Sequence, residues 1–178
     1  MEDLTLTLRP LGELPSGTAA AVGFYDGELS PRLQSLAARS LLADLIKDFA
    51  GITPLPRIVN DNCGKPRFAD HPSLQFNLSH CDGAVLAAVA RDPVGCDIER
   101  IATGAVDDSL MDFCLDEAQR AEVLAAADPD LEFTRIWTRK EALAKRSGRI
   151  YADVTSWPSD DTRVLTRELG RHVISIAW

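Results

Sequence analysis

The stretch VLAAVARDPVGCDIE, residues 85–99, decides the fold. Val85–Ala90 is a continuous apolar run whose length and composition are typical of a buried strand. After a proline, Val94–Ile98 predicts a second strand. Successive side chains of a strand point to opposite faces, so Asp97 and Glu99 emerge from the same face. The stretch therefore predicts a buried strand followed by a strand with two carboxylates on one side.

Strands and helices are expected on both sides of this stretch. Upstream, the patterns predict a helix that begins at Ser30-Pro31 and ends at Gly51. Strands are also expected upstream at Leu4–Leu8, Ala19–Phe24, Arg57–Val59 and Leu74–Leu78. Downstream, the expected elements are a short helix capped by Asp116 with Gln119, a longer helix from Asp128-Pro129 to about Arg146, and strands Thr162–Leu165 and His172–Trp178. The predicted fold class is α+β.

One order of elements occurs twice along the chain: strand, helix ended by glycine, Arg-Ile, and a final apolar strand. Arg57-Ile58 precedes Val85–Ala88, and Arg149-Ile150 precedes Val173–Ile176. This order predicts two similar α+β halves, residues 1–91 and 92–178, that face each other across a cleft. Arg-Ile pairs and apolar strands are common, so chance similarity is the alternative.

The composition is that of a globular protein that needs no metal or disulfide for stability: 178 residues, 46% hydrophobic and 26% charged. The net charge of −8 argues against broad electrostatic binding of nucleic acid or of an anionic membrane. Met1-Glu2-Asp3 is not a basic signal-peptide start, and the longest apolar stretch is too short to span a bilayer, so a cytoplasmic location is expected. The four cysteines form no CxxC pair, which excludes a zinc ribbon and indicates reduced thiols.

A third carboxylate is available from the later helix. Trp137, Glu141 and Lys145 follow each other at intervals of four residues and so form a stripe along one side of it. Together with Asp97 and Glu99, Glu141 completes a set of oxygen donors that suits Mg²⁺, an ion that takes its remaining ligands from water and substrate phosphates. The alternative for each group alone is a solvated strand face or an ordinary Glu–Lys helix pair.

Two further stretches supply groups that suit phosphate and ribose. Gly64-Lys65-Pro66 is expected in a turn, and Phe76–His80 runs from an apolar strand into a loop. Ser79 and His80 are adjacent and no strained glycine elbow accompanies them, which disfavours a hydrolase triad. The alternative interpretation of this stretch is a turn in which Asn77 and Ser79 bond local backbone.

Four of these stretches, in this order, resemble the motifs of the 4′-phosphopantetheinyl transferase superfamily, and most closely its single-chain, pseudo-dimeric type that activates surfactin synthetase. They are Gly64-Lys65-Pro66, Phe76-Asn77-Leu78-Ser79-His80, Val94-Gly95-Cys96-Asp97-Ile98-Glu99 and Trp137-Thr138-Arg139-Lys140-Glu141-Ala142-Leu143-Ala144-Lys145. The resemblance implies two similar halves related by a pseudo-two-fold axis, with the active site between them. It also implies a monomeric enzyme that uses Mg²⁺ to transfer the 4′-phosphopantetheine arm of coenzyme A to a serine of an apo acyl or peptidyl carrier protein, releasing 3′,5′-ADP.

The resemblance further implies roles for individual residues. Asp97, Glu99 and Glu141 resemble the Mg²⁺ ligands. Lys145 resembles the lysine beside the diphosphate of coenzyme A, and Asp97 also belongs to the coenzyme A site. The residues that resemble contacts to the adenosine and its 3′-phosphate are Lys65, Pro66, Ser79 and His80, with Arg39 as a further phosphate-binding arginine in a looser motif. Glu141, directly or through a metal-associated water, is the candidate base for the serine proton, and Lys145 is the candidate for stabilising the leaving group.

Several points stay open at the level of sequence. The chain departs from typical single-chain members in being shorter and in lacking a lysine cluster before Arg39, and these departures concern the N-terminal boundary and the grip on the 3′-phosphate. The alternatives are a coenzyme A or adenine-nucleotide binding module without transferase activity, and an Mg²⁺-dependent phosphoesterase that needs no protein acceptor. The sequence does not identify the carrier. Carrier proteins are commonly acidic, as this chain is, so docking needs a local charged patch or apolar contact. Residues 110–124 are candidates for this contact.

Overall fold

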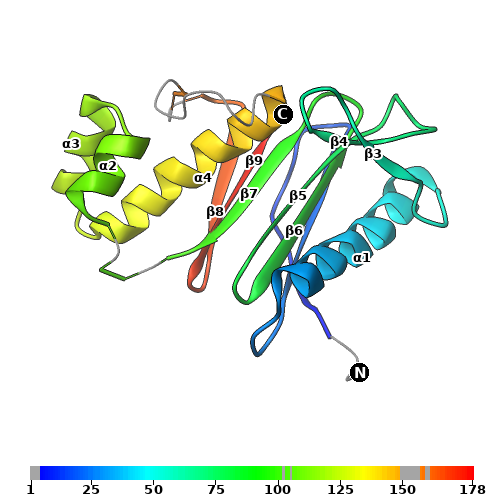
Figure 1. Ribbon diagram of the computed structural model, residues 1–178, viewed down its shortest axis with the longest axis horizontal. Helices are drawn as coiled ribbons and strands as arrows, with labels where there is room; N and C mark the ends of the chain where they lie inside the picture. Colours follow the sequence, from blue (N-terminus) through cyan, green and yellow to red (C-terminus); the bar gives the residue numbers. More distant parts are fainter. Residues whose placement is uncertain (1–4, 102, 105, 149–156, 159–160) are drawn as a thin grey trace.

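The elements form four layers, helix, sheet, sheet and helix, with the two sheets facing each other (Figure 1). The structure, a computed structural model, describes residues 5–101, 103–104, 106–148, 157–158 and 161–178. Its strands are β1 (Thr7–Arg9), β2 (Thr18–Phe24), β3 (Ile58–Asn60), β4 (Pro66–Phe68), β5 (Gln75–Cys81), β6 (Ala84–Ala90), β7 (Gly95–Arg100), β8 (Val164–Leu169) and β9 (His172–Ala177). Its helices are α1 (Pro31–Ala50), α2 (Asp108–Cys114), α3 (Glu117–Ala125) and α4 (Pro129–Ser147). The α+β class expected from the sequence is confirmed.

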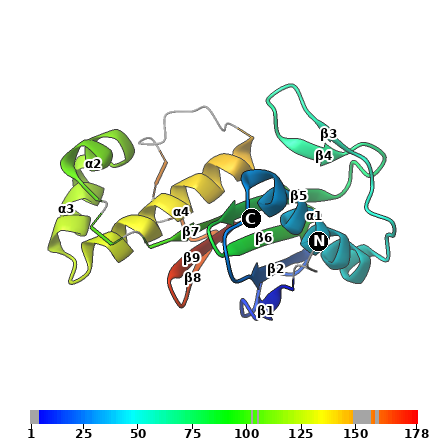
Figure 2. The same cartoon turned by 60° about the horizontal axis from the view of Figure 1, so that its bottom comes forward.

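Both facing sheets are antiparallel, and each has one long helix on its outer side. The first has the strand order β1-β2-β6-β5 and is covered by α1, whereas the second has the order β7-β9-β8 and is covered by α4 (Figure 1, Figure 2). β3 and β4 pair separately beside the first sheet. In both sheets the strand that precedes the long helix pairs with the last strand of a hairpin, β2 with β6 and β7 with β9. The groups β2-β6-β5 and β7-β9-β8 are therefore arranged alike.

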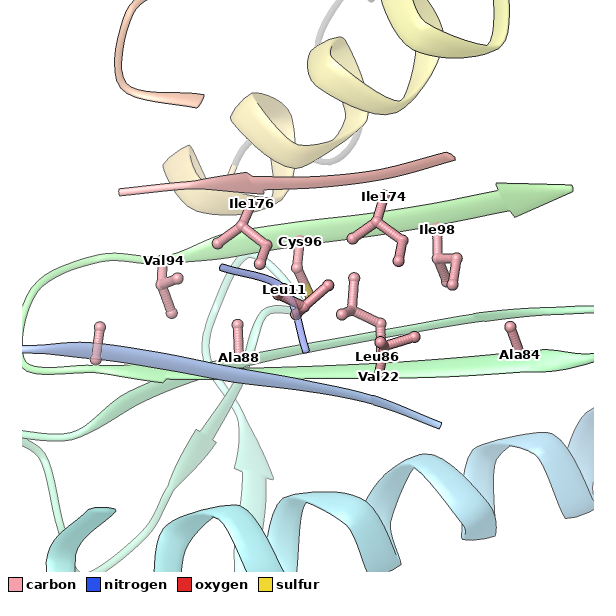
Figure 3. Close-up of a cluster of buried hydrophobic side chains, with 11 residues drawn as sticks. Leu11, Val22, Ala84, Leu86, Ala88, Val94, Cys96, Ile98, Ile174 and Ile176 are labelled. Atoms are coloured by element: carbon pink, nitrogen blue, oxygen red, sulfur yellow. The ribbon is translucent and has the colours of Figure 1, made fainter. Parts of the chain in front are cut away.

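The main core lies between the two sheets (Figure 3). Leu86 of β6, Ile98 of β7 and Ile174 of β9 point into it from both sides. On the opposite face of β6, Val85 and Ala87 pack in a second cluster with α1. β6 is thus buried on both faces, which explains why residues 84–90 contain no polar side chain.

The two long helices begin and end where the sequence predicts. The side chains of Ser30 and Asp128 accept backbone N–H groups of the first turns, and a proline follows each of them at the first helical position. Gly51 and Gly148 end the helices in the left-handed conformation, with φ of 70° and 73°, which a residue without Cβ adopts at little cost.

Other elements differ from the expectation. The first strand, expected at Leu4–Leu8, is β1, and residues 1–4 lie outside the described part of the chain. Pro66, expected in a turn, begins β4. α2 was not expected, because a helix of two turns leaves little periodicity in a sequence. Arg149 and Ile150 of the expected repeat also lie outside the described residues. Within the described ranges, none of the helices is long and apolar enough to cross a membrane.

Candidate active site

β5 and β7 are edge strands of different sheets, and side chains of β5 bond the backbone of β7. Asn77 Oδ1 accepts the N–H of Cys96 at 2.9 Å, and Ser79 Oγ accepts the N–H of Ile98 at 3.4 Å. The two β5 residues are separated by one position and so point to the same side of their strand. Their partners are 19 residues away in the chain, so the alternative in which Asn77 and Ser79 bond local backbone is wrong. The junction brings β5 beside the carboxylates of β7.

Asp97 lies in this junction with only 2% of its surface exposed. Its Oδ1 atom accepts hydrogen bonds from the Ser79 hydroxyl at 2.8 Å and from the Lys145 ammonium at 2.6 Å. Its Oδ2 atom is buried and has no hydrogen-bond partner among the described residues. A buried carboxylate oxygen without a donor is costly, so this atom is suited to bind a cation or a donor from a ligand.

Three elements enclose a pocket of about 330 Å³ next to Asp97. β5 contributes Leu78, Ser79 and His80, β7 contributes Asp97 and Glu99, and α4 contributes Trp137, Glu141 and Lys145. The four-residue spacing on α4 places its three side chains along one side of the helix, as predicted. Lys145 Nζ also lies 3.8 Å from Glu141 Oε2. The three carboxylates and the lysine that the sequence singled out therefore line one pocket.

Burial, and after it the neighbouring charges, changes the proton affinities of the pocket residues. Burial, and after it the negative charge of Asp97, raises the pKa of Glu99 to about 7. Burial also raises the pKa of Glu141, although the nearby Lys145 acts against it. Burial alone lowers the pKa of Lys145, but the charge and hydrogen bond of Asp97 together with the charge of Glu141 act against it, and the net shift is upward. Glu99 and Glu141 therefore hold a proton more readily than exposed glutamates do.

The expected Mg²⁺ ligands line one pocket without forming a ready cage. No group of three or more His, Cys, Asp or Glu side chains in the described part of the chain is arranged to hold a metal ion. The Lys145 ammonium lies against one oxygen of Asp97 instead. Two observations nevertheless fit a divalent cation: the buried Asp97 Oδ2 atom without a partner, and the raised pKa of both Glu99 and Glu141. The donor set therefore fits Mg²⁺, and its binding stays a prediction.

Comparison with known proteins assigns these residues to a family. Residues 93–176 match the model of the 4′-phosphopantetheinyl transferase superfamily. Over 141 residues, the chain is 37% identical to the 4′-phosphopantetheinyl transferase AcpT of Salmonella typhimurium, an alignment that covers 74% of this chain and 70% of that protein. The chain belongs to the 4′-phosphopantetheinyl transferase superfamily. The resemblance expected from the four motifs is confirmed.

Further relatives of the superfamily match a smaller share of their own length. The 4′-phosphopantetheinyl transferase AcpT of Escherichia coli (strain K12) is 41% identical over 116 residues, which cover 64% of this chain and 56% of that protein. The 4′-phosphopantetheinyl transferase gsp of Aneurinibacillus migulanus is 31% identical over 140 residues, which cover 73% of this chain and 57% of that protein. The chain thus spans little more than half the length of these two relatives.

Three residues that the superfamily resemblance assigned to coenzyme A do not line the pocket. Lys65 is buried, and its ammonium donates to the carbonyl oxygens of Val94 at 3.2 Å and Arg146 at 2.9 Å, which ties the start of β7 to the end of α4. Burial lowers the pKa of Lys65. Pro66 is the first residue of β4, and Arg39 is exposed on α1. Their contacts to coenzyme A stay predictions.

His80 does line the pocket, beside Ser79. Burial, and after it the positive charge of Lys145, lowers the pKa of His80. Both effects favour the neutral imidazole, which binds through hydrogen bonds rather than through charge. The role of His80 toward the 3′-phosphate stays a prediction.

Sequence reasoning missed one fully buried charge, Lys140 on α4. Its ammonium donates to the carbonyl oxygen of Cys114 at 2.8 Å and to Gln119 Oε1 at 2.6 Å, so it joins α4 to the α2–α3 connection. The spacing of Ile136, Lys140 and Leu143, which share the buried face of α4, was the signal that could have revealed it.

Proposed function

We propose that this chain transfers the 4′-phosphopantetheine arm of coenzyme A to a serine of an apo acyl or peptidyl carrier protein and releases 3′,5′-ADP, with Mg²⁺ as cofactor. The observation that supports this most directly is the pocket in which three carboxylates and Lys145 meet. The names of relatives in the same superfamily agree with it, since they are 4′-phosphopantetheinyl transferases.

The residues of the pocket suit a displacement at phosphorus. The serine hydroxyl forms a bond to the β-phosphorus of coenzyme A, and the bond from that phosphorus to the bridging oxygen breaks, so 3′,5′-ADP leaves with the electron pair. Glu141 accepts the serine proton directly or through a water molecule. Lys145 places positive charge where the diphosphate charge increases.

Asp97, Glu99 and Glu141 would hold the Mg²⁺ ion, which when bound neutralises charge on the diphosphate. The Ser79 hydroxyl and the Lys145 ammonium both occupy Asp97 Oδ1, which leaves Asp97 Oδ2 as the oxygen available to a cation. The chain's own contribution is therefore to fix the orientation of the Asp97 carboxylate before substrate binds.

The remaining assignments concern the nucleotide end of coenzyme A. His80, Ser79, Lys65, Pro66 and Arg39 are the proposed contacts to adenosine and its 3′-phosphate. If His80 and Arg39 bind the 3′-phosphate, His80→Ala and Arg39→Ala weaken binding of coenzyme A but not of dephospho-coenzyme A. Equal weakening of both ligands, measured by calorimetry, contradicts the assignment.

We further propose that residues 1–91 and 92–178 are two similar halves related by a pseudo-two-fold axis within a monomer. The shared order of β2-β6-β5 and β7-β9-β8 supports this, as does a glycine-terminated helix in the same place in each half. The pocket takes Leu78, Ser79 and His80 from the first half and its carboxylates from the second, which agrees with a site between halves.

The deciding experiment is intact mass spectrometry of apo carrier proteins incubated with the protein, coenzyme A and Mg²⁺. The expected result is a gain of one phosphopantetheine arm on the carrier and an equal amount of 3′,5′-ADP, with Glu141→Gln as the inactive control. Formation of 3′,5′-ADP without a carrier would indicate a phosphoesterase. Coenzyme A binding with no product, across a broad carrier panel, would indicate a binding module.

A further inference from the structure

A row of polar side chains crosses the second sheet beneath α4. Ser175 of β9 is paired with Asp97 of β7 on one side and with Thr166 of β8 on the other. Residues that face each other across antiparallel strands have their side chains on the same face of the sheet. That face is the one that α4 covers (Figure 1), since Lys145 of α4 bonds Asp97 there. The row therefore extends from the proposed Mg²⁺ ligand Asp97 to the edge strand β8.

α4 also bonds the other two members of the row. The Thr138 hydroxyl lies 2.9 Å from the Ser175 hydroxyl, and both residues are fully buried. Arg139 donates to Thr166 Oγ1 at 3.1 Å, and Thr166 Oγ1 lies 3.0 Å from Ser175 Oγ. Each of the three strands of the sheet is therefore bonded to α4 through one residue of the row.

The hydrogen bonds among these hydroxyls all run in one direction. The Thr138 hydroxyl donates to the Arg135 carbonyl oxygen at 3.2 Å, which can only accept. A hydroxyl has one proton, so Ser175 donates to Thr138, and Thr166 in turn donates to Ser175. The guanidinium of Arg139 has only donors and completes the chain. Each of the three hydroxyls thus donates once and accepts once, so none of them lacks a partner.

This chain of hydrogen bonds restricts the position of α4 over the sheet. Apolar contacts have no preferred direction, whereas a hydrogen bond weakens steeply when its angle or distance changes. The chain begins and ends on α4, at Arg139 and Arg135, which are about one turn apart. Thr138 lies in the turn before Glu141 and about two turns before Lys145. The turn that the chain fixes is therefore the one that leads directly to the pocket residues of α4.

We propose that Thr138 and Ser175 are positioning residues, whose hydroxyls hold α4 where Glu141 and Lys145 face Asp97. This inference rests on the proposed transferase function. Both residues are fully buried and neither lines the pocket, so they act on it only through the placement of α4 over β9 and β7. Loss of the hydrogen-bond chain changes the relative placement of the carboxylates, and it therefore weakens Mg²⁺ binding together with turnover.

Thr138→Val and Ser175→Ala test this role, since each removes a hydroxyl with little change in side-chain volume. The expected result for each is a loss of about tenfold in kcat and in the Mg²⁺ affinity measured by calorimetry, the usual effect of removing a group that orients metal ligands. Thr138→Ser keeps the hydroxyl and retains most of both. The double variant Thr138→Val, Ser175→Ala loses little more than either single variant, because both changes break the same chain.

The matched control is Thr134→Val on the same helix. The Thr134 side chain is also buried, but its hydroxyl donates to the Asp130 carbonyl oxygen of α4 itself at 2.6 Å, so its loss leaves kcat and Mg²⁺ affinity unchanged. All variants are compared at a temperature where circular dichroism shows each to be folded. Wild-type kcat and Mg²⁺ affinity in Thr138→Val, an equal loss in Thr134→Val, or no recovery in Thr138→Ser overturns the positioning role. Failure of the wild-type protein to modify any carrier overturns the transferase and with it this role, a result distinct from transfer by Thr138→Val with unaltered kinetics.

Discussion

At the scale of single residues, the pocket depends on how Asp97 is held. Ser79 and Lys145 both bond Oδ1, and Oδ2 is left for a ligand. We expect Ser79→Ala to lower kcat/KM by about ten- to a hundredfold, the usual effect of removing a group that orients a ligand residue. Ser79→Thr keeps the hydroxyl and retains most activity. The measurements are steady-state kinetics at limiting Mg²⁺ and calorimetry of Mg²⁺ binding. Equal Mg²⁺ affinity in wild type and Ser79→Ala would show that this hydroxyl does not position Asp97.

We expect loss of the Asp97 charge to lower activity more than loss of the Ser79 hydroxyl does. Asp97→Asn keeps the side-chain volume but removes the charge opposite Lys145, and we expect turnover to fall by about a hundredfold or more. A circular-dichroism spectrum like that of the wild type is the control for folding. Near-normal turnover of Asp97→Asn and of Glu141→Gln at limiting Mg²⁺ is the outcome that rules out the three-carboxylate site.

Glu99 should make stability depend on pH. Its pKa is raised from 4.5 to about 7 in the folded chain, so between these values the folded state binds a proton that the unfolded state has lost. The free energy of unfolding therefore falls as pH rises through this window, and the contribution of Glu99 is fully present only below it. Denaturant titrations should show Glu99→Gln becoming more stable relative to wild type from pH 4.5 to 7, and Mg²⁺ should reduce the difference. A difference that does not vary with pH contradicts the raised pKa.

At the scale of elements, the close packing of β7 against α4 depends on Gly95. A Cβ atom at this position would overlap the carbonyl oxygen of Ala142 and lie 2.9 Å from the Cα atom of Arg146. Both obstacles are backbone, which cannot rotate away, so we expect Gly95→Ala to lower the free energy of unfolding by about 3 kcal/mol or more. Gly51→Ala, where a Cβ meets nothing within 4 Å, costs only the left-handed strain of about 1 kcal/mol. Urea denaturation compares the two, and similar losses would show that α4 can move.

Features of the helices and strands could be predicted from the sequence where they are caused by residues close together in the chain. The caps of α1 and α4 and the apolar strand β6 follow from nearby residues, and all were predicted. The stripe of Glu141 and Lys145 also follows from helix geometry alone. The bonds of Asn77 to β7 and of Lys65 to Val94 and Arg146 depend on partners brought close only by folding, so no local pattern revealed them.

At the scale of the whole molecule, the pocket exists because two separate sheets meet along β5 and β7. These strands belong to different sheets, and the Asn77 side chain takes the place of a strand partner for the Cys96 N–H. Both groups are buried, so Asn77→Ala leaves a donor without a partner and should lower the free energy of unfolding by about 1–3 kcal/mol.

The same substitution should reduce activity beyond its effect on stability, because the first sheet contributes Ser79 and His80 to the pocket while the second contributes the carboxylates. The matched control is Gln75→Ala in the same strand, since the Gln75 amide donates to the nearby Pro72 carbonyl oxygen at 3.2 Å in an exposed position. Its cost should stay within about 0.5 kcal/mol. Both variants are compared by chemical denaturation and by kinetics at a temperature where each is fully folded. If Asn77→Ala has the kcat and KM of the wild type, the β5–β7 junction stabilises the fold without positioning the site.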